Sequence, residues 1–346
     1  MFYLLNKFSV KGFKNFKEEC VLDLSNRNMN TYLIYGKNAS GKTNLGYALF
    51  DIVTVLTGKY YNPDKYRYSL HLNGNQKSID FKYQFKINNK EYYYGYSKDG
   101  NGDLLYEVLY IDSQLKFEFN HRIKSFIVDN IGITGSINEI RSSILRYLSF
   151  LGIYTEADDL INYVEKMIWF DGFDTMGYFN HKVNILQDIA DNHSYIIDDL
   201  CKFLNSNGVS ENLQVVDNAF GKSLCFVYDN RSVQFSDIAS KGTIAMVNYY
   251  YITQVVKDCT FLFMDEFDSN YHFELSDNII LYSKNLDHQT LMTTHNLRLM
   301  SNRFLDSDCF YIIDNRGVNS IDTLTDRNLN IPFNLAKLYA GGEFNE

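Results

Sequence analysis

The feature that most constrains this chain is a glycine-containing loop, Gly36 to Thr43, which reads GKNASGKT. It fits the spacing GxxxxGK[ST], and the apolar run Thr31 to Tyr35 just before it predicts a strand. After the loop, apolar residues recur at steps of three and four between Leu45 and Leu56, which predicts a helix with one face on a sheet. A strand, a glycine loop and a helix in this order predict an α/β fold with a phosphate-binding turn.

Each part of this loop has a physical role in holding phosphate groups. Backbone N–H groups of the loop and of the helix N-terminus point at the phosphates, Lys42 supplies a positive charge, and the Thr43 hydroxyl binds Mg²⁺. The alternative, a simple glycine turn, leaves the flanking strand and helix unexplained. The candidate nucleotide-binding residues are Gly36, Lys37, Asn38, Ala39, Ser40, Gly41, Lys42, Thr43 and Asn44.

A second candidate element is the apolar run Phe261 to Met264, which ends in two adjacent carboxylates, Asp265 and Glu266. Carboxylates at the end of a buried strand are costly unless a cation or a reaction uses them. Asp265 is a candidate Mg²⁺ ligand through water, and Glu266 is a candidate general base that polarises the attacking water. The competing interpretation is a strand end with two solvated acids.

A third strand is predicted at Thr290 to Thr294, and it is followed by His295. A lone histidine is usually structural, but its place after this strand and downstream of the carboxylate pair favours contact with the terminal phosphate. Strands and helices alternate throughout this part of the chain, which predicts a parallel sheet covered on both faces. The nucleotide is expected at the carboxyl ends of its strands.

Together these motifs resemble the ABC-type ATPases of the SMC, RecF and OLD group. The resemblance is carried by GKNASGKTNL (Walker A), FLFMDEFD (Walker B) and LMTTHN, and by the N-terminal KGFKNFKE, in which Lys14 to Phe16 would lie near the adenine. The ending NLAKLYAGGEF resembles small stand-alone members, including ATPases of the phage-defence systems Septu, PARIS and abortive infection. The resemblance implies ATP and Mg²⁺ as ligands and Lys42, Glu266 and His295 as catalytic residues.

Two further elements are identified by the same resemblance. Ser240 to Thr243 is similar to the short SxGT form of the family signature, in which Ser240 and Gly242 would contact the ATP of a second subunit. Asp268 resembles the D-loop of the family, at the subunit interface. Taken alone, Ser240 to Thr243 is equally a helix cap, and an ordinary acidic turn is the competing interpretation of Asp268. The signature lacks its leucine and second glycine, and no Q-loop glutamine is assigned.

The chain is expected to form an ABC-type ATPase head with a mixed sheet, an antiparallel β meander and an inserted helical lobe. Residues 68–120 alternate apolar and polar positions between Asn/Gly turns, which predicts the meander. The predicted division is 1–120 for the first part of the head, 121–215 for the helical lobe and 216–346 for the second part. A sustained heptad pattern is absent, so the lobe is not predicted to be a coiled coil.

The composition limits where such a protein works and what it binds. The formal net charge of −9 disfavours a protein that mainly covers nucleic acid, although a local basic groove for DNA stays possible. Five scattered cysteines without CxxC spacing indicate neither a disulfide framework nor a zinc site. Neither a signal peptide nor an apolar run long enough to span a membrane is evident, so the expected location is cytoplasmic.

The leading functional hypothesis is an ATPase whose ATP-bound copies pair face to face and control a partner effector, such as a nuclease or toxin, in anti-phage defence. The first alternative is a RecF-like DNA-binding repair ATPase. A transporter subunit is disfavoured because it would show a fuller signature. A sensor that binds ATP without turnover is disfavoured because it does not need Glu266.

Overall fold

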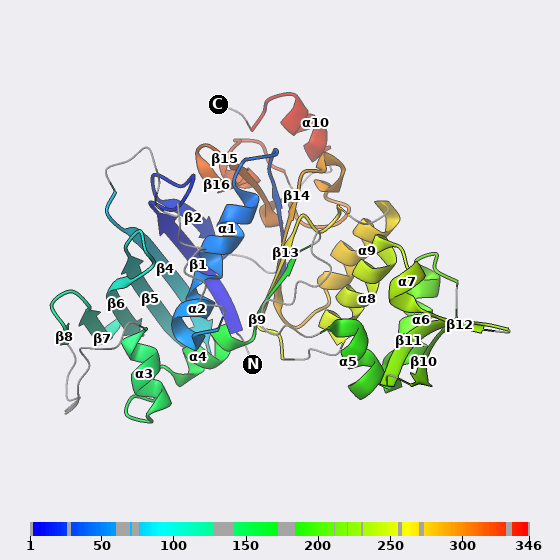
Figure 1. Cartoon of the computed structure of the whole chain (residues 1–346). Helices are drawn as coiled ribbons and strands as arrows, with labels where there is room; N and C mark the ends of the chain where they lie inside the picture. The colour runs from blue at the N-terminus through cyan, green and yellow to red at the C-terminus, as the bar shows by residue number, and fades with distance from the viewer. Residues whose placement is uncertain are drawn as a thin grey trace.

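The computed structural model describes most of the chain, as three sheets with helices packed between and beside them (Figure 1). The described residues are 3–25, 29–59, 70, 76–126, 142–171, 184–210, 212–219, 221–229, 231–254, 258–269, 273–329 and 334–344. Within them, no helix has the length and apolar character needed to cross a membrane.

The first sheet is antiparallel and has seven strands in the order β2-β1-β4-β5-β6-β7-β8. The alternation of β4, IDFKYQFKI, places every second side chain in the core. Asn88 and Asn89 both have positive φ, 51° and 66°, and form the tight turn into β5. The predicted meander is therefore present. Its strands are β1 Tyr3–Lys11, β2 Cys20–Asp23, β4 Ile79–Ile87, β5 Lys90–Lys98, β6 Leu104–Ile111, β7 Gln114–Asn120 and β8 Ser125–Phe126.

The second sheet has six strands in the order β16-β15-β3-β14-β13-β9. From β15 to β9 all neighbours are parallel, and β16 pairs antiparallel to β15. Every residue of β3, β13 and β14 is buried, as both-faced coverage requires. The strands are β3 Thr31–Tyr35, β9 Met167–Asp171, β13 Phe261–Asp265, β14 Gln289–Thr294, β15 Phe310–Asp314 and β16 Gly317–Ser320.

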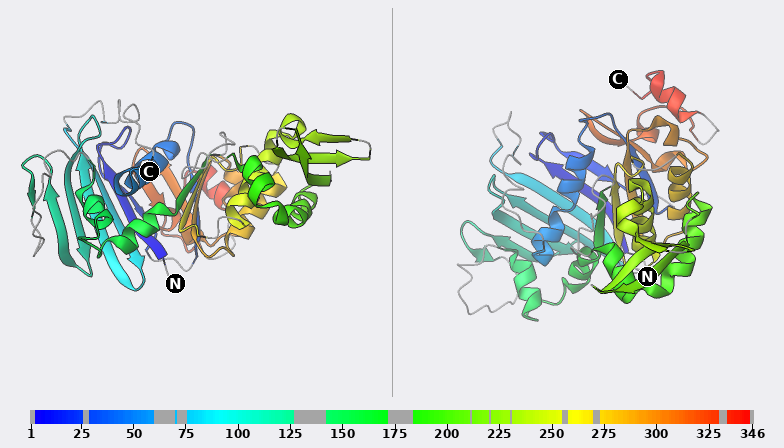
Figure 2. Two further views of the ribbon diagram at one scale, coloured as in Figure 1. Left: turned by 60° about the horizontal axis from the view of Figure 1, so that its bottom comes forward. Right: turned by 45° about the vertical axis from the view of Figure 1, so that its right-hand side comes forward.

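Helices cover both faces of this parallel sheet. In Figures 1 and 2, α1 (Lys42–Leu49) and α2 (Asp51–Thr57) lie between the two large sheets, and α8 (Lys241–Gln254) and α9 (Phe273–Ser283) cover the opposite face. The Tyr83 hydroxyl of β4 donates to the Ala48 carbonyl of α1 at 3.0 Å, which joins the first sheet to this helix layer.

The stretch 121–215, expected as one helical lobe, is distributed over the molecule. Helices α3 (Ile144–Phe150) and α4 (Asp158–Glu165) lie beside α2, whereas β9 is an edge strand of the parallel sheet. Further along, α5 (Ile185–Asn192) and α6 (Ile197–Ser206) lie beside α8. The stretch is therefore not helical throughout, and the predicted boundaries of the three parts stay a prediction.

A small third sheet, of order β10-β11-β12, extends from the side of α5 and α6 (Figure 2). Its strands and the remaining helices are β10 Asn212–Asn218, β11 Gly221–Tyr228, β12 Arg231–Gln234, α7 Phe235–Ile238 and α10 Leu335–Ala340. Short 3-10 helices are η3 Ser194–Ile196, η4 Leu297–Leu299, η5 Ser307–Cys309 and η6 Ile321–Thr323.

Candidate functional site

The loop Gly36 to Gly41 joins the carboxyl end of β3 to the first residue of α1. Its first amide, Gly36 N, donates to the Thr294 carbonyl of β14 at 3.2 Å, so the loop begins at the sheet edge. Ala39 and Gly41 have positive φ, 63° and 106°, and Gly41 precedes α1 without a side-chain cap. This backbone leaves main-chain N–H groups at the start of α1, where the helix dipole favours an anion.

Both glycines of the loop stand where a side chain would not fit. A methyl group on Gly36 would overlap Ser40 Oγ and lie 2.5 Å from Ile313 Cγ2 of the neighbouring strand. A methyl group on Gly41 would overlap the side-chain amide of Asn15. The glycines of the GxxxxGK pattern therefore allow close packing of the loop on the residues around it.

Lys42 directs its ammonium back into the loop. Its Nζ donates to the Gly36 carbonyl at 2.9 Å and to the Lys37 carbonyl at 3.3 Å, and it lies 3.6 Å from Glu266 Oε1. The Lys42 side chain is only 4% exposed, and that of Glu266 is 19% exposed. The structure thus brings together the two charges that the sequence predicted from separate motifs.

The carboxylate pair lies where β13 ends, and a threonine of the adjacent strand orients it. Thr293 Oγ1 donates to Asp265 Oδ1 at 2.6 Å and accepts the Glu266 N–H at 2.8 Å. Asp265 is buried, and Glu266 has φ of 43°, in the left-handed region that non-glycine residues rarely adopt. Such backbone strain is concentrated at functional sites, where the surrounding contacts hold it.

His295 and Asp268 both lie at the carboxyl end of β14. His295 follows Thr294 directly and is exposed. Thr294 Oγ1 donates to Asp268 Oδ1 at 2.7 Å and accepts the Asn296 N–H at 2.9 Å. Asp268 is therefore hydrogen-bonded to the strand that precedes His295, which an ordinary solvated acidic turn would not require.

The Ser240 to Thr243 segment begins α8, on the opposite face of the parallel sheet from α1 (Figure 1). Ser240 Oγ accepts the Thr243 N–H at 3.1 Å and pairs with the Thr243 hydroxyl at 2.8 Å. The structure thus shows a helix cap here and does not bring Ser240 or Gly242 to the loop of the same chain.

Two side chains near the loop were not predicted as loop contacts. Asn15 accepts from Asn44 Nδ2 at 2.7 Å and reaches the Ser40 carbonyl at 3.5 Å. Lys14, with φ of 47°, places its Nζ 4.3 Å from the centre of the Tyr47 ring. Burial lowers the pKa of Lys14. Lys14 and Asn15 thus lie beside the loop and the first helix, whereas the family resemblance implies only that they lie near the adenine.

The residues present fit a nucleotide with Mg²⁺. Ser40 Oγ is buried inside the loop without a hydrogen-bond partner among the described residues, which is costly unless a ligand or water supplies one. The Thr43 hydroxyl and the Asp265 carboxylate are hard oxygen donors of the type that Mg²⁺ prefers. Within the described part of the chain, no group of three or more His, Cys, Asp or Glu side chains is arranged to hold a metal ion.

A comparison with protein families identifies the family of this chain. The family model described as "AAA domain, putative AbiEii toxin, Type IV TA system" matches residues 32–301, more than half of the chain. That range contains the loop, the carboxylate pair and His295. The comparison with curated proteins gives no match.

Several solved structures have a similar fold at low sequence identity. The Smc head domain with an extended coiled coil, bound to the C-terminal domain of ScpA from Pyrococcus furiosus, is 13% identical, with 93% of this chain and 98% of that chain covered and a TM-score of 0.53. The SmcHead bound to the C-winged helix domain of ScpA is 14% identical, with coverage of 92% and 99% and a TM-score of 0.50. The recombination mediator protein RecF is 14% identical, with coverage of 92% and 98% and a TM-score of 0.47, too low to support an argument.

The family match and the Smc head fold confirm the resemblance found in the sequence motifs. The chain therefore belongs to this AAA domain family and has the fold of the Smc head domains.

Proposed function

We propose that this chain binds ATP with Mg²⁺ at the loop Gly36 to Asn44 and hydrolyses the terminal phosphate. The observation that carries the proposal is the 3.6 Å approach of Lys42 Nζ to Glu266 Oε1 at the carboxyl edge of a parallel sheet. Bound Mg²⁺ would neutralise charge on the phosphates, with Thr43 and Asp265 as its protein ligands.

The roles of the side chains follow from their positions. Lys42 holds the phosphates electrostatically, and the Glu266 carboxylate accepts a proton from the attacking water. The Thr293 hydroxyl fixes Asp265 and the Glu266 backbone, so neither has to reorganise during the reaction. His295, exposed at the end of β14, contacts the terminal phosphate.

Two copies are expected to pair face to face across ATP. Ser240 and Gly242 begin a helix that covers the face of the parallel sheet opposite to α1 (Figure 1), so they complete a site only on another copy. Asp268 lies next to that interface. Binding of ATP would then join two copies, and hydrolysis would release them.

An ATPase whose copies join and separate in this way needs a partner protein on which to act. The two Smc heads of similar fold are each bound to a domain of a partner protein, ScpA. We infer that this chain controls an effector, such as a nuclease or toxin, in anti-phage defence, as the family description and the C-terminal motif favour. The net charge of −9 favours a protein client over a RecF-like role on DNA.

The test is Glu266→Gln, with Glu91→Gln at an exposed position of β5 as the matched control. We expect turnover to fall by about 10²- to 10⁴-fold, because the general base is lost, while Mg²⁺-dependent ATP binding persists. Light scattering should show that Glu266→Gln becomes dimeric with ATP and is monomeric without it. Unchanged turnover in this variant, or absence of Mg²⁺-dependent ATP binding by the wild type, would refute the proposed function.

A further inference from the structure

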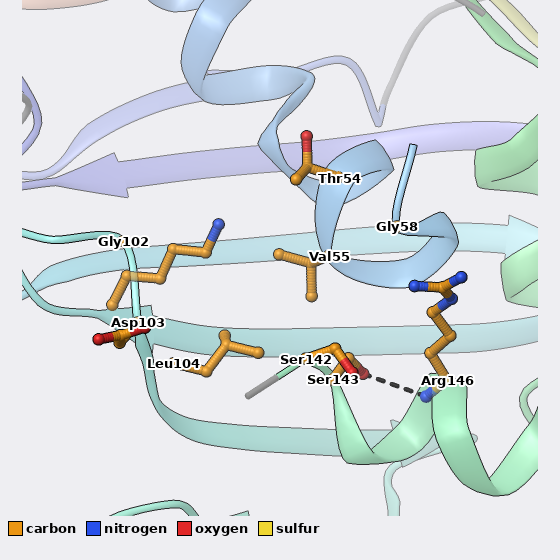
Figure 3. A pocket seen from close by; sticks show the side chains of 10 residues that line it. Thr54, Val55, Gly58, Gly102, Asp103, Leu104, Ser142, Ser143 and Arg146 are labelled. Atoms are coloured by element: carbon orange, nitrogen blue, oxygen red, sulfur yellow. Dashed lines mark hydrogen bonds between the residues drawn. The ribbon is translucent and has the colours of Figure 1, made fainter. Parts of the chain in front are cut away.

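A cavity of about 360 Å³ lies away from the nucleotide loop, between α2 and the sheet that α2 packs on. Figure 3 shows α2, with Val55 and Gly58, on one side of it and Leu104, Ser142 and Arg146 on the other. Its volume is in the range of small-molecule sites. Its lining combines apolar and cationic side chains, so the identity of a ligand can be argued from charge.

Arg146 is the group that gives this cavity a charge preference. Its guanidinium packs against the C-terminal end of α2, so closely that a methyl group on Gly58 would overlap it. The side chain is half-buried, and no carboxylate among the described residues forms an ion pair with it. A partly desolvated guanidinium without a carboxylate is a binding site for a planar or tetrahedral anion.

The other charged residues around the cavity do not form ion pairs with Arg146 in the described part of the chain. Lys98, which also lines it, is bound at 2.7 Å to Asp51, so this buried pair is neutral overall. Asp103 is exposed, and in Figure 3 it lies at the opposite end of the cavity from Arg146. Glu107, behind Ser143, is fully buried and already accepts hydrogen bonds from Tyr94, His121 and Ser143, so Arg146 is the charged group on the wall that a ligand can reach.

Hydrogen bonding and apolar contact complete the site. The Ser143 hydroxyl already donates to Glu107 at 2.6 Å, but Ser142 is exposed beside Arg146 and can donate to an anion. Val55 and Leu104 offer an apolar wall. We propose that this cavity binds a small organic anion, whose phosphate or carboxylate group is held by Arg146 and Ser142 and whose carbon atoms pack on Val55 and Leu104.

The cavity and the nucleotide loop adjoin consecutive helices of the chain. Helix α2 begins at Asp51, only one residue, Phe50, after the end of α1, and α1 begins at Lys42. A ligand in the cavity therefore contacts the helical segment that continues from the loop.

The test is thermal unfolding of the full chain with three probes: glycerol 3-phosphate, succinate, and glycerol as the neutral control. Saturating ADP and Mg²⁺ are present throughout, so that the phosphate probe does not report on the nucleotide loop. At ten times its Kd, a bound anion should raise Tm by about 2 °C, and glycerol should not. The two anions distinguish a phosphate ligand from a carboxylate ligand.

Variants assign the shift to this cavity. Arg146→Ala and Ser142→Asp should abolish it, the second by placing a carboxylate beside Arg146, whereas Arg122→Ala at an exposed position should retain it. If Arg146→Ala fails to fold, the Tm shift measured in Ser142→Asp still tests the proposal. A shift that persists in the cavity variants, or no shift with either anion, would overturn the proposal. Failure of the wild type to bind ADP would instead count against the proposed function. The cavity variants would still show whether the anions bind in this cavity.

Discussion

The edge of the parallel sheet and the interior of the antiparallel meander both hold charged side chains away from water, but in different ways. Glu107 of β6 is fully buried and accepts four hydrogen bonds, from Tyr94, His121, Ser143 and the Ile144 N–H, at 2.6 to 2.9 Å. Glu266 is partly exposed, has a strained backbone and faces Lys42 without a hydrogen bond between the two side chains.

This difference distinguishes a carboxylate that stabilises the fold, Glu107, from one that can take part in a reaction, Glu266. A buried carboxylate with all its acceptor sites occupied fixes the packing around it, here by joining β6 to the start of α3. A carboxylate held at a strand end beside a cation is less completely satisfied and is free to bind a ligand or accept a proton. Substitutions in the two regions should therefore have different effects.

The largest expected effect on stability is that of Glu107→Ala. It leaves four buried donors without an acceptor, so we expect a loss of about 3–5 kcal/mol in the free energy of unfolding. Urea unfolding followed by circular dichroism measures it, with Glu91→Ala as the exposed control. A loss no larger than that of Glu91→Ala would mean that the hydrogen bonds to Glu107 do not stabilise this region.

Thr293→Val should reduce both the stability of the fold and the rate of ATP turnover, each by less than the substitutions at Glu107 and Glu266. The substitution keeps the shape but removes the donor to Asp265 and the acceptor of the Glu266 N–H, which costs about 1–3 kcal/mol. We expect turnover to fall about tenfold, since each 1.36 kcal/mol of barrier changes the rate by that factor. Thr290→Val is the matched control, because the buried Thr290 hydroxyl of the same strand has no partner among the described residues. Equal effects at both positions would remove the orienting role of Thr293.

The smallest effect is expected from Asn15→Ala. The loss of its contacts to Asn44 and the Ser40 carbonyl should weaken ATP binding about fivefold, or about 1 kcal/mol, with little change in stability. Titration with ATP and Mg²⁺ measures the change in Kd. A lower Tm with unchanged Kd would assign Asn15 to the fold rather than to the loop.

The sequence predicts the parts of the site that are local in the chain. The spacing of Gly36, Gly41 and Lys42 and the adjacent acids Asp265 and Glu266 lie within short segments whose flanking strands and helix follow from apolar periodicity. The supporting contacts could not be found in this way. Asn15 is 25 residues from Ser40, and Thr293 is 28 residues from Asp265, so only the folded sheet brings them together.

Two features of the fold were missed for related reasons. Met167–Asp171 is a short apolar run between helices, which periodicity alone does not distinguish from a buried helix segment, and it forms β9 of the parallel sheet. Glu107 lies within the alternating pattern of β6 and would be expected to face solvent. It is buried because α3, whose placement the pattern does not reveal, brings Ser143 and the Ile144 N–H to it.

The most direct measurement is a side-by-side determination of ATP turnover and urea stability for the wild type, Glu266→Gln and Glu107→Ala. We expect Glu266→Gln to lose turnover and to unfold at the wild-type urea concentration, and Glu107→Ala to unfold at lower urea and to retain turnover per folded molecule. Retained turnover in Glu266→Gln would contradict the assignment of chemistry to the carboxylate beside Lys42.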